Sequence, residues 1–135
     1  MKGVLITVLP ILATISHAQK IASSNDSLLI GTWKGTSICQ VRPSPCNDEI
    51  AIYHVTRGAK PKTFHFVMNK MVNEKEEEMG ALDFNFDVAK QTLSYRDNQR
   101  NTTWNFNVGD HQMDGTLVYK DQLYRIIKLT KVATK

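Results

Sequence analysis

The chain of 135 residues lacks most of the signatures of a metal site, a hydrolase or a nucleic-acid-binding surface. Its four histidines do not fall at metal-ligand spacing, and neither GxSxG nor HExxH occurs. Lysines and arginines form no stripe with interleaved aromatic residues, so the formal net charge of +4 indicates solubility rather than nucleic-acid binding. We therefore expect a protein that is not an enzyme, with no catalytic residue, metal or cofactor and no nucleic-acid partner.

Long hydrophobic runs are also absent after the first residues of the chain. One lysine precedes the apolar stretch Gly3–Ile15, which is followed by Ser-His-Ala; this order is typical of a secretory signal peptide over residues 1–18. The stretch is too short to span a membrane, and no later segment could do so. We expect a disordered lead-in over residues 19–29, one domain over residues 30–135, and a secreted or periplasmic location.

Cysteine is scarce, and both copies stand close together in "CQVRPSPC". Six residues separate them, which does not fit a redox CxxC motif, and a zinc site needs more ligands. In an exported chain, the simplest interpretation is a disulfide between Cys39 and Cys46.

What the sequence does contain is an almost unbroken alternation of apolar and polar residues. Phe64, Phe66 and Met68 lie on one face of a predicted strand. In another predicted strand, Thr103, Asn105 and Asn107 lie on the face exposed to water. The segment from Asn73 to Met79 is charged and predicts a hairpin rather than a helix. The alternation predicts strands over residues 31–39, 49–56, 63–72, 77–86, 92–96, 102–108, 112–119 and 122–131. Eight strands with short connections are typical of an all-β, antiparallel up-and-down barrel.

A small barrel can be filled by its own side chains or hold one small ligand. The candidate ligand-binding residues on the inward faces are Phe64, Phe66, Phe84, Trp104, Tyr119 and His54. His54 lies on the same face of its strand as Ile50 and Ile52, so we expect it to point inward. It would be either a core histidine bonded to the backbone or a ligand contact. A few polar groups within an apolar lining are what a small-molecule site requires.

The triplet Gly31-Thr32-Trp33, at the start of the first strand, resembles the G-x-W opening of lipocalins and the wider calycin group. The chain also resembles small secreted lipocalin-like proteins of Bacteroidetes-type bacteria. In lipocalins the tryptophan plugs the closed end of the barrel, and a basic residue from late in the chain packs across it. The resemblance implies that Gly31, Trp33 and Arg125 form this structural plug.

Two functions remain open on these grounds. The first is a secreted or periplasmic protein that binds a small apolar or amphipathic ligand inside the barrel. The second is a protein-binding barrel, such as an inhibitor of an exported hydrolase, whose loop over residues 40–48 docks on its partner. An enzyme that uses His54 and Arg125 comes last.

Overall fold

The computed structural model describes residues 3–4, 10 and 27–134. Most of the expected signal peptide and most of the expected lead-in therefore lie outside the described residues. The end of the lead-in, residues 27–29, is helical, and Leu29 is fully buried, so the expectation of a disordered segment is wrong for this part. Within the described residues, no helix is long and apolar enough to cross a membrane.

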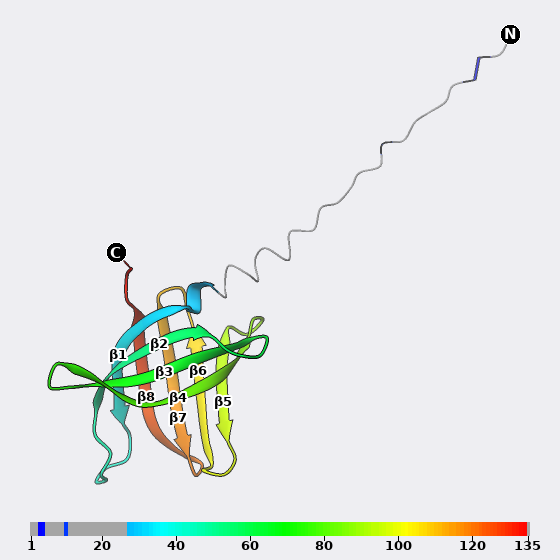
Figure 1. Ribbon diagram of the computed structural model, residues 1–135. Helices are drawn as coiled ribbons and strands as arrows, with labels where there is room; N and C mark the ends of the chain where they lie inside the picture. The colour runs from blue at the N-terminus through cyan, green and yellow to red at the C-terminus, as the bar shows by residue number, and fades with distance from the viewer. Residues whose placement is uncertain (1–2, 5–9, 11–26, 135) are drawn as a thin grey trace.

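The domain is a closed barrel of eight antiparallel strands, each hydrogen-bonded to the next and the last to the first (Figure 1). The predicted fold class is confirmed, and the strand ends differ from the prediction by at most two residues. The strands are β1 (Gly31–Cys39), β2 (Glu49–Arg57), β3 (Thr63–Val72), β4 (Lys75–Asp87), β5 (Thr92–Asp97), β6 (Thr102–Val108), β7 (Gln112–Tyr119) and β8 (Gln122–Lys131).

An aromatic cluster fills the middle of the barrel. Phe66 lies 4.5 Å from Phe84 between ring centroids, and Phe106 lies 5.6 Å from Phe84 and 6.0 Å from Phe66. All three side chains are buried, as the period-two alternation of their strands predicts. Aromatic pairs at such distances each add about 0.5–1.5 kcal/mol beyond the area that they bury. This part of the interior is therefore packed core.

Closure between β1 and β8 depends on a glycine. A Cβ atom added at Gly35 would lie 1.8 Å from the carbonyl oxygen of Lys128 on β8. Any other residue would force these two strands apart, so only glycine fits at this close approach of β1 to β8.

Trp33 closes one end of the barrel. Its indole Nε1 donates a hydrogen bond to the carbonyl oxygen of Leu29 at 2.9 Å, and the side chain is fully buried. The basic group nearest its ring is Lys131, whose Nζ lies 5.8 Å from the ring centroid and also donates to the carbonyl of Leu28. Gly31, with φ of 140°, lies against the Lys131 side chain. We call this end of the barrel the closed end.

The expectation that Arg125 covers Trp33 is wrong. Trp33 pairs with Lys131 across the β1–β8 ladder, whereas Arg125 pairs with Cys39 at the other end of β1. The two basic residues share one face of β8, and the register of the ladder gives the position over the indole to Lys131.

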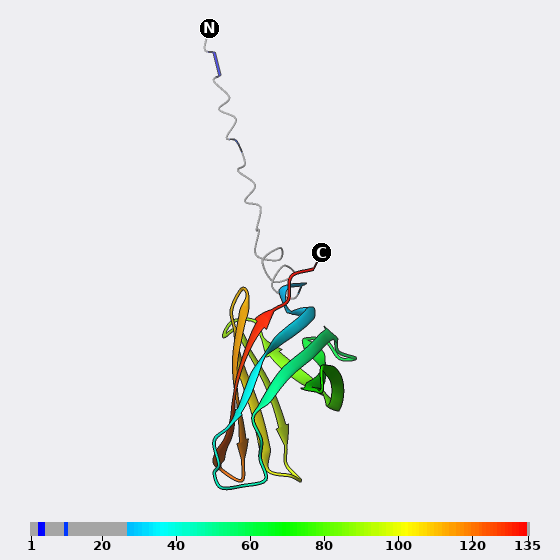
Figure 2. The same ribbon diagram turned by 90° about the vertical axis from the view of Figure 1, so that its left-hand side faces the viewer.

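The ring of strands is least complete between β4 and β5. These strands pair over three positions only, Asn85–Asp87 with Thr92–Ser94, while β4 follows β3 along most of its length. The β3–β4 hairpin diverges from the barrel and projects from its side (Figures 1 and 2). Its turn residues Asn73 and Glu74 both have positive φ, as hairpins with two-residue turns require, so the predicted charged hairpin is confirmed.

Candidate functional site

A pocket of about 420 Å³ lies in the half of the barrel away from Trp33. Every strand contributes to its wall, because the inward-facing residues of a barrel converge on one axis. The apolar part consists of Tyr53, Met68, Met79, Ala81, Leu82, Tyr95, Trp104 and Leu117, with Gly80 between them. The polar part consists of Ser37, Glu49, Asp97, Arg100, Thr102 and Arg125. This composition, apolar with a few convergent polar groups, is typical of small-molecule sites.

One wall of the pocket carries a hydrogen-bonded ion pair. Arg125 Nη2 lies 3.3 Å from Glu49 Oε1, and Nη1 donates to the hydroxyl of Ser37 at 3.1 Å and to its carbonyl oxygen at 3.3 Å. The side chains of Arg125 and Glu49 are 12% and 15% exposed. A largely desolvated pair of this kind needs partners for its remaining polar atoms, and Ser37 supplies one.

Tyr53 adds a buried hydroxyl-bearing side chain to the same wall. Burial raises the pKa of Tyr53 well above its usual value; the charge of Glu49 raises it further, and Arg125 partly opposes the shift. The hydroxyl therefore stays protonated and keeps its ability to donate a hydrogen bond.

The mouth of the pocket lies where β4 and β5 separate. On the β5 side, Asp97 Oδ1 accepts the backbone N–H groups of Gln99 and Arg100 and so fixes the tight β5–β6 turn. On the β4 side, a Cβ atom added at Gly80 would meet no atom within 4 Å, so open space lies beside the backbone here. The mouth is therefore bounded by one rigid turn and one bare stretch of strand.

The structure separates the five aromatic residues among the predicted ligand-binding residues into three groups. Trp104 lines the pocket. Phe64, Phe66 and Phe84 are fully buried, and none of them is part of the pocket wall. Tyr119 lies at the end of β7, is 38% exposed, and contacts Tyr124 instead.

The expectation that His54 points inward is wrong. Its neighbours Ala51, Tyr53 and Val55 occupy the buried face of β2, which leaves His54 on the outer face of the barrel. There Nε2 lies 2.7 Å from Glu76 Oε1, and Nδ1 lies 3.1 Å from the hydroxyl of Thr32.

This outer group is a hydroxyl–histidine–carboxylate chain on the outer surface of the barrel. The His54 and Glu76 side chains are 40% and 41% exposed on the surface of the sheet, away from the pocket. Hydrogen bonds from His54 and Asn69 hold the pKa of Glu76 below its usual value. We interpret the group as a cross-strand contact between β1, β2 and β4.

Sequence reasoning missed several pocket residues, above all those on β2. Apolar residues occur on both faces of this strand: Ile50 and Ile52 on one, Ala51 and Tyr53 on the other. The alternation therefore does not choose a face by itself. Glu49 follows the parity of Tyr53, and this shared parity is the signal that could have placed it in the pocket.

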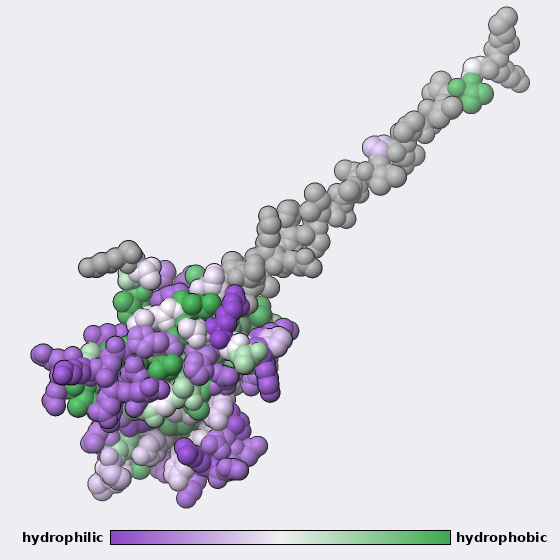
Figure 3. Space-filling view, in the orientation of Figure 1, coloured by the Kyte–Doolittle hydropathy of each residue, from purple (hydrophilic) through white to green (hydrophobic). Residues whose placement is uncertain are grey.

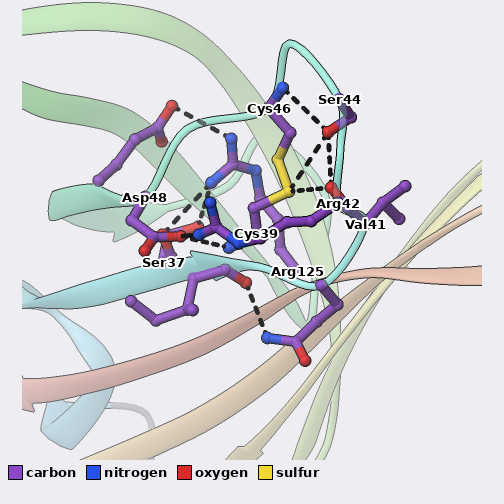
Figure 4. Close-up of a disulfide and its surroundings, with 11 residues drawn as sticks. Ser37, Cys39, Val41, Arg42, Ser44, Cys46, Asp48 and Arg125 are labelled. Atoms are coloured by element: carbon purple, nitrogen blue, oxygen red, sulfur yellow. Dashed lines mark hydrogen bonds and ion pairs between the residues drawn. A yellow bond between two sulfur atoms is a disulfide. The ribbon is translucent and has the colours of Figure 1, made fainter.

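The predicted disulfide is confirmed, and it clips a loop that adjoins the polar wall (Figure 4). Cys39 and Cys46 have Cα atoms 6.0 Å apart, within the usual range for disulfides. Asp48 accepts hydrogen bonds from the Cys39 backbone N–H at 2.9 Å and from Arg42 Nη2 at 2.6 Å. Because Cys39 pairs directly with Arg125, the loop and the ion pair are neighbours.

The fold and the pocket together define the class of the protein: an antiparallel eight-stranded barrel, packed at one end and hollow toward the other. Over residues 27–134, no group of three or more histidine, cysteine or acidic side chains is arranged to hold a metal ion. The sequence matches no family model and none of the curated proteins searched.

Proposed function

We propose that the protein is a secreted or periplasmic lipocalin-like barrel that binds a small amphipathic molecule in the pocket. The observation that carries the proposal is the composition of one half-open pocket of about 420 Å³, an apolar lining with the Arg125–Glu49–Ser37 wall on one side. Its volume falls within the usual range for small-molecule sites. The disulfide and the signal-like first residues support the location.

The chemistry of the wall favours a ligand with one polar end. The apolar residues Met68, Leu82 and Leu117 gain from excluding water, whereas the polar groups lose hydration unless the ligand replaces it. A head group that hydrogen-bonds to Arg125 or Tyr53, with an apolar body over the remaining wall, satisfies both requirements.

Tryptophan fluorescence tests the proposal directly. Trp104 lines the pocket, whereas Trp33 is buried at the closed end, so a bound molecule quenches one of the two. We expect the purified protein to show quenching and a raised melting temperature with 8-anilinonaphthalene-1-sulfonate or another member of an amphipathic library. The quenching should disappear in Trp104→Phe.

A filling variant locates the binding. Gly80→Phe places a ring in the open space beside β4, and Ala89→Phe adds a similar ring in the exposed β4–β5 turn as the control. We expect Gly80→Phe to lose binding and Ala89→Phe to keep it, with similar melting temperatures. The proposal fails if a broad library gives neither quenching nor stabilisation, or if Gly80→Phe binds as the wild type does.

The clipped loop supports a second candidate function, binding to an exported hydrolase. Ser44 Oγ donates to the Val41 carbonyl at 2.6 Å and accepts from the Cys46 backbone N–H at 3.2 Å, so the loop is held by its own contacts (Figure 4). A preorganised loop loses little conformational entropy on docking. In a panel of exported proteases and glycan-cleaving enzymes, Arg42→Ala should weaken inhibition and the exposed control Lys90→Ala should not. Inhibition of no enzyme by the wild type would eliminate this candidate.

A further inference from the structure

The longest unpaired strand edge of the described domain belongs to β4. This strand pairs with β3 from Lys75 to Asn85, but β5 lies beside it from Asn85 onward only. From Lys75 to Phe84 the other edge of β4 has no strand partner. No turn or loop takes its place, because none of the backbone hydrogen bonds found outside the ladders of the described residues involves this segment.

Such an edge offers a ready template for another strand. Alternate residues of β4 turn their backbone N–H and C=O groups away from β3, over a length of roughly 30 Å. Lys75 to Ala81 are exposed, no proline interrupts the edge, and Gly80 has open space beside it. An added strand would therefore meet donors and acceptors that no other backbone group of the described residues engages.

The charge on the edge indicates what kind of strand it fits. Lys75, Asp83 and three glutamates, Glu76–Glu78, give β4 a formal charge of −3 between Lys75 and Phe84, although the whole chain carries +4. His54 engages Glu76, and His65 engages Asp83 at 2.6 Å. Among the described residues, Glu77 and Glu78 are exposed and make no ion pair, so two carboxylates remain for an incoming strand. The β3–β4 hairpin is largely hydrophilic in the space-filling view (Figure 3).

A second copy of this chain is a poor partner for the edge. Two β4 edges in contact would bring −3 against −3, and like charges directly opposite each other destabilise a ladder. A segment with lysine or arginine at alternate positions meets the opposite condition. Its charged side chains all lie on one face of the enlarged sheet, so they would lie beside Glu78 on one face or, with the segment turned over, beside Glu77 on the other.

We propose that the free edge of β4, from Lys75 to Phe84, receives an extended basic segment of a partner protein by β-strand addition. Backbone hydrogen bonds to β4 provide the affinity, and the glutamates select the charge of the segment. This interaction goes beyond the proposed binding of a small molecule. It uses the backbone edge of β4 beside the mouth of the pocket, whereas the ligand occupies the interior of the barrel.

The first test uses the unmodified protein and an acetylated, amidated decapeptide of alternating lysine and valine. In ¹⁵N-labelled protein, we expect the peptide to shift amide signals of Lys75 to Phe84 and to slow their hydrogen exchange. Two control peptides separate the causes: one with glutamate for lysine, and one with N-methyl groups on every residue, which removes the donors on both edges. Neither should bind. Equal binding of the N-methylated peptide, or shifts scattered over the barrel, would overturn the proposal.

The second test reverses the charge of the edge. Glu77→Lys combined with Glu78→Lys should weaken binding of the basic decapeptide about tenfold and permit binding of the glutamate peptide. The matched control, Asp110→Lys with Asp114→Lys, makes the same charge change on exposed residues of the β6–β7 hairpin. Its binding should stay within about twofold of the wild type. Equal losses in both double variants would show attraction to net charge alone and would refute strand addition at β4.

Discussion

The ion pair in the pocket wall allows a quantitative prediction about stability. Replacing Arg125 with methionine keeps much of the side-chain volume but leaves Glu49 largely buried without its cationic partner. Removing one member of a fully buried pair costs about 3–5 kcal/mol, whereas exposed pairs contribute about 0–1 kcal/mol. With exposures of 12% and 15% and an N–O distance of 3.3 Å, this pair lies between these limits. We expect Arg125→Met to lower the free energy of unfolding by about 2 kcal/mol.

Most of this cost should come from the stranded carboxylate, and a double-mutant cycle measures that share. Glu49→Gln removes the charge, so adding it to Arg125→Met should restore about 1 kcal/mol or more. The assay is urea unfolding of the wild type, both single variants and the double variant, followed by fluorescence. The m value reports whether the variants still unfold as one unit. If the single effects add to within about 0.3–0.5 kcal/mol, the two side chains do not interact and the reasoning is wrong.

Two further predictions concern the closure of the barrel and its outer face. Gly35→Ala places a Cβ atom 1.8 Å from the carbonyl oxygen of Lys128, so we expect the free energy of unfolding to fall by about 3 kcal/mol or more. A melting temperature within about two or three degrees of the wild type would contradict this expectation. The pKa of Glu76 is lower in the folded protein than its ordinary value of 4.5, so its carboxylate adds stability above that pH and loses it as the pH falls through the folded pKa. The stability difference between wild type and Glu76→Gln should therefore shrink in acid, and a difference that stays constant from neutral pH to pH 3 would refute this assignment.

The fold could be predicted because one simple pattern recurs in most strands. In β4 and β6, large apolar residues such as Phe84 and Phe106 occupy one parity while polar residues occupy the other. Water then decides which face turns inward, without any knowledge of the partner strands. The β2 strand shows the limit of the pattern, because both of its faces carry apolar residues, and His54 was assigned to the wrong side.

The pocket and the plug could not be predicted from such patterns, because they depend on register. Arg125 and Lys131 have the same parity on β8, so alternation alone gives both the same direction. Whether Arg125 or Lys131 reaches Trp33 depends on the register of β8 against its neighbours. That register is set by the length of each turn and by the register shift between Leu117 and Val118. In the same way, the mouth exists because β4 leaves β5 after three pairs, with a register shift between Met68 and Asn69 on the other side of β4. No local sequence feature of residues 75–97 predicts that β4 and β5 separate.

The two ends of the described domain leave the barrel side by side at its closed end. The backbone N–H of Val132 donates to the carbonyl of Thr32 at 2.9 Å, and both ends lie at the same side of the molecule in the two views (Figures 1 and 2). The clipped loop and the β5–β6 turn are at the opposite end. A fluorescent protein, a purification tag or a solid support attached at either end is therefore kept away from the pocket. A short linker between the ends would also permit a circular permutant that begins at β8 and ends at β7, with the chain opened in the exposed β7–β8 turn. All the other connections between consecutive strands would stay as they are in the natural chain.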